Sequence, residues 1–232
     1  SNSILFGGSV TSSNTESSVV GGFTNDVTSA KYAMIAGRNH TINTSHQSVI
    51  GGHTNKDTTG TNNAIFGESQ DVATSSNVIV SGSTNDLDNV ENSLTIGRNN
   101  TVNGAGETIV SGQSHNVSNG EYNIISGDNS SVTNTNSSLI TGVNHTILNT
   151  NKSFVSGQVI QETSGTNNAL VGESLISSSN TNSILVGKSN NISNSKEAMI
   201  SGEGNTVANS NQVLVAGASH NVSNTTIGSL VS

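Results

Sequence analysis

Few residues of this chain could carry out chemistry. Asp71 and Asp86 lie fifteen residues apart, with Lys56 fifteen residues earlier. Two carboxylates about 5 Å apart are the arrangement of a retaining glycosidase. No aromatic sugar platform and no apolar pocket that would keep one of the two carboxyls protonated accompanies this pair. We therefore interpret the pair as solvated surface and predict no catalytic residue.

The six histidines raise the possibility of a metal site. His40, His115, His145 and His220 share a column with asparagines such as Asn25, and the histidines of this column lie two or more turns apart. That separation is too large for two of them to share an ion within one chain. We expect Asn and His side chains of this column to hydrogen-bond the backbone of a bend. The alternative is an axial ion held by three copies of one histidine.

Composition excludes several classes of protein. The chain has no Cys, so disulfides and thiolate metal sites are excluded, and we predict no metal and no cofactor. Only 9% of the residues are charged, the net charge is -8, and seven Lys and Arg are scattered along the chain, so we expect no nucleic-acid partner. No run of eighteen apolar residues and no signal peptide is present, so we expect no direct membrane insertion and interpret the sequence as an excised segment.

A column of glycine defines a repeat of fifteen residues without insertion or deletion. Its members are Gly7, Gly22, Gly37, Gly52, Gly67, Gly82, Gly97, Gly112, Gly127, Gly142, Gly157, Gly172, Gly187, Gly202 and Gly217. The sequence of residues 59–69 also returns in similar form 105 residues later, at residues 164–174, which indicates duplication of a seven-turn block. We expect one repetitive domain over residues 1–232.

Apolar columns accompany the glycines. The residue three before each Gly is always apolar, and the residue two before it is apolar in fourteen of the fifteen turns, with Thr95 the exception. Adjacent strand residues point to opposite faces, so this strand is apolar on both faces. A second apolar column, five residues after the Gly and including Val27 and Ile42, indicates another strand with one buried face. The pattern predicts an all-β parallel solenoid of fifteen turns.

The two-faced strand predicts self-association. We assign the column three before the Gly to the inside of the coil, so the column two before it requires another covered surface. A parallel, in-register homotrimer would bury this second column on a common axis. The predicted interface residues are Leu5, Val20, Ile35, Ile50, Ile65, Val80, Val110, Ile125, Ile140, Val155, Leu170, Leu185, Ile200 and Val215.

Segments such as Ser48–Gly52 and Ser183–Gly187, each followed by the pattern x-x-Asn-x-Val/Ile or a close variant, resemble the heads of trimeric autotransporter adhesins of the YadA-like type. The resemblance covers essentially all turns, although this repeat is one residue longer than the family's commonest head repeat. It implies a left-handed parallel β-roll with three chains around an axis. It also implies export to the bacterial cell surface and anchoring in the outer membrane through regions absent from this segment.

Two irregularities are candidate ligand contacts. In turns eleven and twelve, Val159, Ile160, Leu175 and Ile176 replace the usual polar residues, while Glu162 and Ser177 occupy the apolar column. These aliphatic residues form either an exposed patch for a partner or a strand whose register shifts locally to bury them. Tyr32 and Tyr122, at equivalent places before the first strand, are either sugar or protein contacts or surface filler.

We expect a surface adhesin head that attaches to host or other bacterial cells. Its ligand would be a surface protein or glycan, bound through polar columns rather than a deep pocket. The alternatives are a phage tail fibre or spike, an ice-binding solenoid and a polysaccharide-cleaving β-helix. Ice binding requires regular Thr-x-Thr columns, whereas Thr41, Thr101, Thr146 and Thr206 never occupy successive turns. The enzyme would require larger turns and a carboxylate-lined groove.

Overall fold

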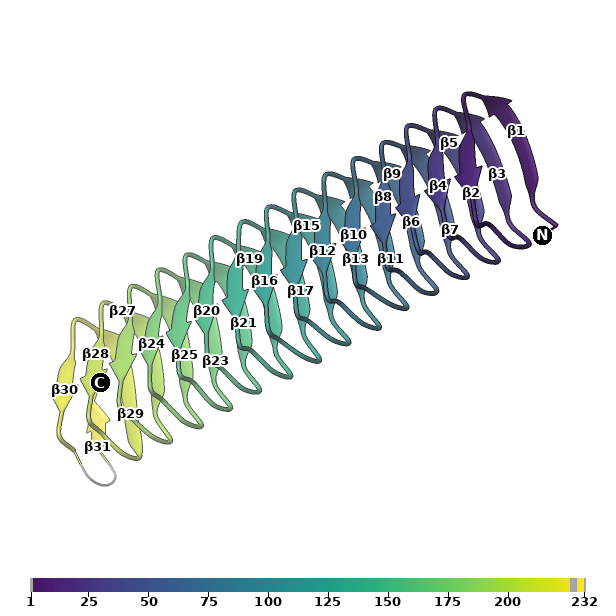
Figure 1. Ribbon diagram of the computed structural model, residues 1–232. Helices are drawn as coiled ribbons and strands as arrows, with labels where there is room; N and C mark the ends of the chain where they lie inside the picture. The colour runs from purple at the N-terminus through teal and green to yellow at the C-terminus, as the bar shows by residue number, and fades with distance from the viewer. Residues whose placement is uncertain (1, 226–228, 232) are drawn as a thin grey trace. The chain divides into compact units, whose positions relative to one another are not determined.

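The computed structural model describes residues 2–225 and 229–231. It is an all-β parallel solenoid of about 15 turns, and the described residues contain no helix (Figure 1). The chain forms two compact units, Ser1–Ser118 and Asn119–Ser232. Both units are built from the same kind of turn. The expectation of a single repetitive domain over residues 1–232 stays a prediction.

Unit 1 contains a sheet of long strands and a sheet of short strands. The long strands are β1 (Ile4–Gly8), β3 (Val19–Phe23), β5 (Met34–Arg38), β7 (Val49–His53), β9 (Ala64–Glu68), β11 (Ile79–Ser83), β13 (Leu94–Arg98) and β15 (Ile109–Gln113). The short strands are β2 (Thr11–Ser13), β4 (Asp26–Thr28), β6 (Thr41–Asn43), β8 (Lys56–Thr58), β10 (Asp71–Ala73), β12 (Asp86–Asp88), β14 (Thr101–Asn103) and β16 (Asn116–Ser118).

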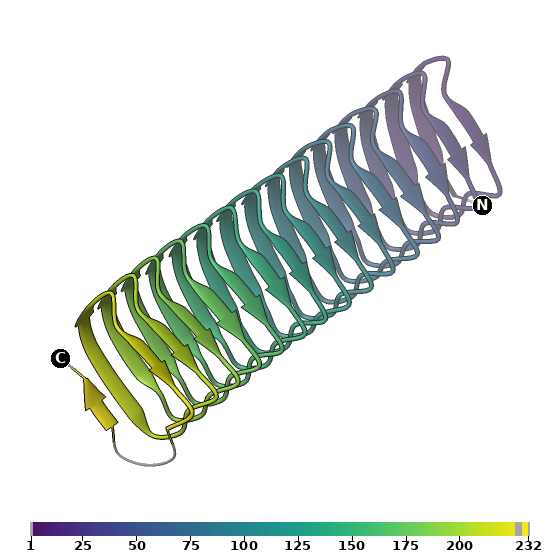
Figure 2. The ribbon, with the colours of Figure 1, turned by 90° about the vertical axis from the view of Figure 1, so that its left-hand side faces the viewer.

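Unit 2 has the same two kinds of strand. The long strands are β17 (Ile124–Asp128), β19 (Leu139–Val143), β21 (Phe154–Gln158), β23 (Ala169–Glu173), β25 (Ile184–Lys188), β27 (Met199–Glu203), β29 (Val213–Ala218) and β31 (Ser229–Val231). The short strands are β18 (Ser131–Thr133), β20 (Thr146–Leu148), β22 (Gln161–Thr163), β24 (Ile176–Ser178), β26 (Asn191–Ser193), β28 (Thr206–Ala208) and β30 (Asn221–Ser223). Figure 2 shows the long strands lying side by side.

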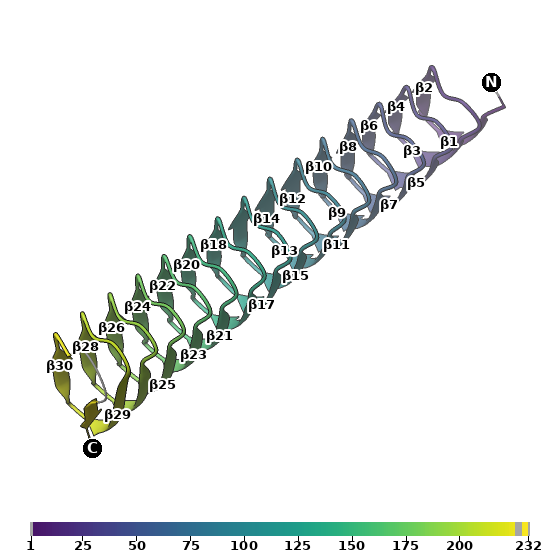
Figure 3. The same cartoon turned by 90° about the horizontal axis from the view of Figure 1, so that it is seen from below.

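Within each unit, every strand pairs in parallel with the strand one turn later. In β11 and β13, for example, Ile79 pairs with Leu94 and Gly82 with Gly97. The register advances by fifteen residues at each step from β1 to β15, which confirms the repeat predicted from the glycine column. Figure 3 shows the long and short strands as two separate rows.

Each turn also has a third side, which the sequence pattern did not reveal. Between the short strand of one turn and the long strand of the next, one residue bridges in parallel to the next turn. In unit 1 these residues are Glu16, Lys31, His46, Thr61, Ser76, Glu91 and Gly106, and in unit 2 they are Glu121, Asn136, Asn151, Thr166, Thr181, Lys196 and Asn211. A ladder one residue wide has no hydrophobic periodicity, so only the regular fifteen-residue spacing could have indicated it.

The three corners of a turn require unusual backbone geometry. Thr24, Ser29 and Tyr32, one at each corner of a single turn, have φ of 57°, 56° and 55°. Residues other than glycine rarely adopt this left-handed conformation. The N–H group of each of these residues donates to a carbonyl of the preceding turn at 2.9 Å. The strained corners are therefore held by the same ladder that joins the strands.

The interior combines apolar and polar columns. Val80 and Leu87, two and five residues from a glycine, are fully buried. The column three residues after the glycine holds buried amides: Asn85 donates to the carbonyls of Ser81 and Gly97, and its Oδ1 accepts from the N–H of Asn100. Each amide thus joins its own turn to the next, which confirms the predicted role of the Asn column.

Histidine fills the same role. The N–H of Asn55 donates to His40 Nδ1 at 3.1 Å, so Nδ1 is unprotonated, and Nε2 lies 3.2 Å from the Ala36 carbonyl, to which it donates. Burial lowers the pKa of His40, although its two backbone hydrogen bonds act in the opposite direction. His40 is therefore a neutral structural residue in this column.

The glycine column has a steric cause. At Gly202, φ is 119°, and an added Cβ would lie 1.8 Å from the Gly217 carbonyl oxygen. The neighbouring Gly204 has φ of 66°, and its nearest atom would lie 3.8 Å away. Ser189 and Ser219, at equivalent corners, adopt φ of 54° and 61°. Gly202 is thus required by close approach of two backbones, whereas Gly204 occupies a corner that tolerates a side chain.

We predict that Gly202→Ala lowers the free energy of unfolding by at least about 3 kcal/mol, because the new Cβ meets backbone as well as adopting a disfavoured φ. The matched variant Gly204→Ser should change it by less than about 1 kcal/mol. Urea denaturation followed by circular dichroism measures both. Equal losses for the two variants would contradict the steric argument.

Candidate functional site

The outer face of the long-strand sheet carries one exposed column of apolar side chains. We call this column, three residues before each glycine, the outer stripe. In unit 1 it comprises Ile4, Val19, Met34, Val49, Ala64, Ile79, Leu94 and Ile109, and in unit 2 Ile124, Leu139, Phe154, Ala169, Ile184, Met199 and Leu214. Met34 is 55% exposed and Ile79 50%, values that are unusual for side chains of this kind.

The structure reverses the predicted assignment of the two faces. The residues predicted to form a trimer interface lie inside the coil of their own chain, apart from Leu5 in the first turn, which is half exposed. The buried ones are Val20, Ile35, Ile50, Ile65, Val80, Val110, Ile125, Ile140, Val155, Leu170, Leu185, Ile200 and Val215. Since none of these can face a partner, that residue set is wrong.

The physical reason is the direction of the glycine corner. Residues two before the glycine and the glycine itself have the same parity along the strand, and the chain bends toward that side. The residue one before the glycine shares the outer face with the stripe. It is Ser81, Ser111 or Ser126 in several turns, and such polar content was the signal that identifies this face as the outside.

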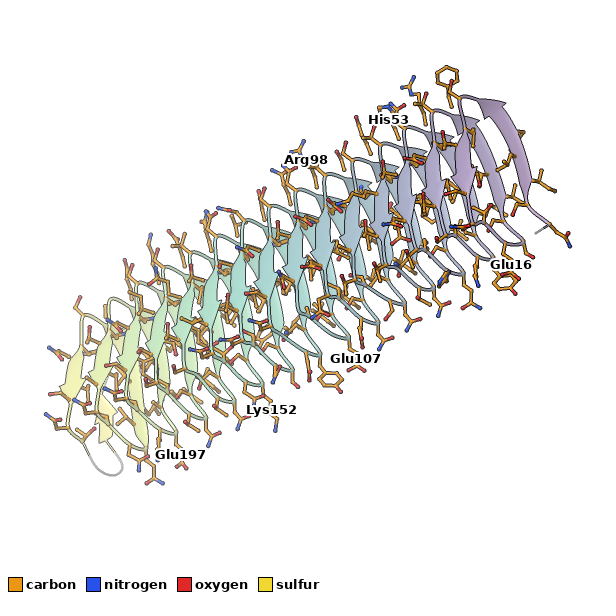
Figure 4. All side chains as sticks on the ribbon, in the orientation of Figure 1. Glu16, His53, Arg98, Glu107, Lys152 and Glu197 are labelled. Carbon is orange, nitrogen blue, oxygen red and sulfur yellow. The ribbon has the colours of Figure 1, made fainter. Side chains whose placement is uncertain are left out.

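The outer face changes from apolar to charged across its width. The residue one before the glycine is usually small, and the residue one after it is often charged, as in the ion pair of Lys188 Nζ with Glu173 Oε2 at 3.7 Å. Figure 4 shows that in unit 1 His53 and Arg98 project away from the coil on the side of the glycine corner, opposite Glu107. The outer stripe is thus bordered by a polar margin.

The outer stripe is hollowed at Ala169 in unit 2. Ala169 lies between the larger Phe154 and Ile184, and a groove of about 640 Å³ opens there. Its remaining lining residues are Ser137, Leu139, Lys152, Ser153, Asn167, Asn168 and Asn182. One wall is held by a hydrogen bond of 3.0 Å from Asn167 Nδ2 to Asn182 Oδ1.

An equivalent arrangement occurs in unit 1. Ala64 lies between Val49 and Ile79 in neighbouring strands. Asn62 Nδ2 donates to Asn77 Oδ1 at 2.9 Å, as Asn167 does to Asn182 in unit 2.

The predicted aliphatic contacts of turns eleven and twelve divide into two pairs. Ile160 and Leu175 are fully buried in the column that Asn or His fills in most other turns, whereas Val159 and Ile176 are 41% and 42% exposed. Glu162 keeps its regular pairing with Ile147 and Ser177, so the proposed local register shift is wrong. Only Val159 and Ile176 remain available as contacts.

The two predicted tyrosine contacts lie at corners beside the outer stripe. Tyr32 and Tyr122 are 58% and 59% exposed and occupy the same column as Asn167, which lines the groove. Their exposure agrees with either interpretation made from the sequence, and ligand binding by them stays a prediction.

The carboxylate pair of unit 1 lies on the outer side of the short strands. Lys56 Nζ lies 3.0 Å from Asp71 Oδ2, and both side chains are about half exposed. Partial burial raises the pKa of Asp86, the charges of Asp71 and Asp88 add to this effect, and Lys56 opposes it. The described residues contain no group of three or more His, Cys, Asp or Glu that could hold a metal ion.

Two other carboxylates are fully buried in the coil. Asp57 and Glu162 occupy the apolar column of the short strands, 105 residues apart. The sequence pattern drew attention to Glu162 but not to Asp57. Ser45 Oγ and Asn63 Nδ2 donate to Asp57, while Ser153 Oγ and Asn168 Nδ2 donate to Glu162 at 3.0 and 2.9 Å.

Glycines three residues later make room for these carboxylates. A Cβ on Gly60 would lie 2.1 Å from Asp57 Oδ1, and one on Gly165 would lie 2.2 Å from Glu162 Oε1. Burial raises the pKa of Asp57 and of Glu162, and their hydrogen bonds only partly offset it. Both acids have neutral donors and no cationic partner among these hydrogen bonds.

We predict that the double variant Asp57→Asn/Glu162→Gln melts about 2–4 °C higher than the wild type at pH 7.5. A carboxylate whose pKa is raised on folding stabilises fully below its unfolded pKa, and this contribution is lost as pH rises through the folded pKa. The advantage of the double variant should therefore shrink as pH falls toward 4. Both proteins contain the same histidines, so the difference between them isolates the two acids.

Thermal denaturation between pH 4.5 and 7.5 measures this difference. Glu91→Gln, at an exposed position of the third side, is the matched control and should not alter the profile. A difference that does not vary with pH would show that the two acids are not titrating as buried groups.

A comparison with protein-family models finds no match for this chain, and a comparison with curated protein sequences finds no similar protein. Within the described residues, no helix is long and apolar enough to cross a membrane.

Proposed function

We propose that this chain is the head of a trimeric bacterial surface adhesin. The observation that carries the proposal is the outer stripe, which stays exposed although the interior of the coil is already filled by other columns. The fifteen-residue solenoid is compatible with the β-roll of such heads, and the resemblance of repeats such as Ser48–Gly52 supports the same class.

The outer stripe requires a partner for energetic reasons. Soluble monomers rarely expose contiguous apolar patches beyond a few hundred Å². Each buried Å² of apolar surface contributes roughly 25 cal/mol to association. The stripe residues occupy the same position on successive strands, as Ile79, Leu94 and Ile109 do on β11, β13 and β15. A partner surface that runs along the strands and covers one of these side chains therefore also covers its neighbours.

A parallel closed assembly covers the column best. When equivalent turns of each copy lie at the same level, every apolar side chain meets others of its own column, and the polar margin stays outside. The resemblance to adhesin heads sets the number of copies at three. The left-handed coil is part of the same proposal.

The surfaces away from the outer stripe suit adhesion. Exposed amides form short ladders at strand spacing, such as Asn134 Nδ2 to Asn149 Oδ1 at 2.9 Å and Asn129 Nδ2 to Asn144 Oδ1 at 2.8 Å. Amides of this kind can hydrogen-bond a surface protein or glycan. We place the protein at the bacterial cell surface, where it attaches to host or other bacterial cells.

We predict a solution mass of three times 23.6 kDa by light scattering. Ile79→Glu/Ile109→Glu introduces charges into the outer stripe and should give a monomer. Ser83→Glu, on the polar margin of the same strand as Ile79, should stay trimeric. Since the altered side chains are exposed in the single chain, circular dichroism should show an intact fold. A monomeric wild type would overturn the trimer.

We further predict that beads coated with the trimer bind host epithelial cells or bacterial cells. The monomeric Ile79→Glu/Ile109→Glu variant should bind about 10²-fold or more weakly, because avidity is lost. Ser83→Glu is again the matched control. A wild-type trimer that binds neither kind of cell above an albumin-coated bead would overturn the adhesin assignment while leaving the assembly intact.

A further inference from the structure

Three exposed aliphatic side chains lie on or beside the short strands of unit 2, on three successive turns. The first and third residues of each short strand point outward, and the middle residue points inward. Leu148 on β20 and Ile176 on β24 are the only large apolar residues at the outward positions of the unit 2 short strands. Val159 lies at the corner that leads into β22, the strand between them. We call these three residues, which are 36–42% exposed, the aliphatic patch.

Val159 is an unusual residue for its corner. Its φ is 53°, and it is the only apolar aliphatic side chain among the described residues with left-handed φ. The corresponding corner of unit 1, 105 residues earlier, holds Thr54 with φ of 57°. A β-branched side chain is disfavoured in this conformation, and Thr at least presents a hydroxyl to water. The fold alone therefore gives no reason for an exposed valine here.

The corresponding face of unit 1 has a different chemistry. Asn43 and Asp71 stand 105 residues before Leu148 and Ile176. The outward positions of the unit 1 short strands include five charged residues: Asp26, Lys56, Asp71, Asp86 and Asp88. Those of unit 2 include no Asp, Glu, Lys or Arg. The aliphatic patch thus lies on an uncharged face.

We propose that the aliphatic patch is a contact between two copies of this chain that belong to different trimers. Each chain has a net charge of -8, so two heads repel one another over most of their surfaces. On the uncharged face of unit 2, two copies approach without bringing carboxylates together, and the aliphatic side chains leave water. This inference rests on the proposed surface head and names a head on a neighbouring cell as its binding partner.

This contact is compatible with the trimer. The trimer covers the outer stripe on the long strands, whereas the aliphatic patch lies on or beside the short strands, which form a separate row (Figure 3). Three partly exposed side chains give only a weak contact. A trimer presents the patch three times, so many weak contacts act together when two surfaces covered with heads meet.

Gln161 allows a test that only a contact between copies would pass. It pairs in register with Thr146 and Ile176 and lies in the middle of the patch. Gln161→Lys and Gln161→Glu should each weaken the pairing of trimers about 10-fold or more, because two copies then place like charges against each other. An equal mixture of the two variants should pair at least as strongly as the wild type. Sedimentation velocity measures this pairing.

The patch itself is tested by the triple variant Leu148→Asn/Val159→Thr/Ile176→Thr. It should raise the trimer concentration of half-pairing about 10-fold or more and abolish the clumping of trimer-coated beads. Thr206→Asn, on the same face in β28, is the matched control and should change this concentration by less than about 2-fold. Circular dichroism and light scattering should show an intact fold and an intact trimer for every variant.

Wild-type trimers that do not pair would overturn the contact while the trimeric head stands. The same holds for a mixture of the two Gln161 variants that pairs no better than either variant alone. A chain that never forms trimers would overturn the proposed head, and charge-dependent pairing of its single chains would leave the contact standing.

Discussion

The fold depends on the backbone hydrogen bonds that join each turn to the next at a step of fifteen residues. This ladder includes three corners with left-handed φ and a glycine column where two backbones nearly touch, as at Gly202 and Gly217. An insertion of one residue would reverse every inward and outward side chain of a strand and misalign the buried amides. The absence of insertions from the glycine column follows from this constraint, because each turn is stabilised mainly by its two neighbours.

The same ladder explains how 30% hydrophobic residues suffice. Two apolar columns fill the centre, and side chains such as Asn85 supply hydrogen bonds that would otherwise be missing at the corners. A buried amide repeated at one spacing satisfies its partners in every turn, which removes the usual cost of burying polar groups. Asp57 and Glu162 are accommodated at the same place in the two seven-turn blocks because Gly60 and Gly165 accompany them. The 105-residue repeat therefore preserves each buried acid together with the glycine that makes room for it.

The period, the all-β class, the parallel stacking and the roles of Asn85 and His40 could be predicted from sequence, because spacing alone determines them. The choice of inner and outer face could not be read from the two apolar columns, since strand alternation separates Ile79 from Val80 without saying which side is closed. Ser81, which shares a face with Ile79, held that information. The third side escaped prediction because one bridging residue per turn cannot show an alternation of apolar and polar residues. The hollow at Ala169 could be recognised only once the structure showed which larger side chains lie beside it.

The outer and inner faces of the long strands obey different rules. Inside, Val80 and Leu87 are surrounded by their own chain, so size is limited by the coil. Outside, the residues are free to vary unless another molecule limits them, yet the outer stripe is apolar in every turn. Solvent alone gives no reason for an apolar residue at every turn of an exposed column. A surface that covers the column gives one, because each apolar side chain that it removes from water contributes to association.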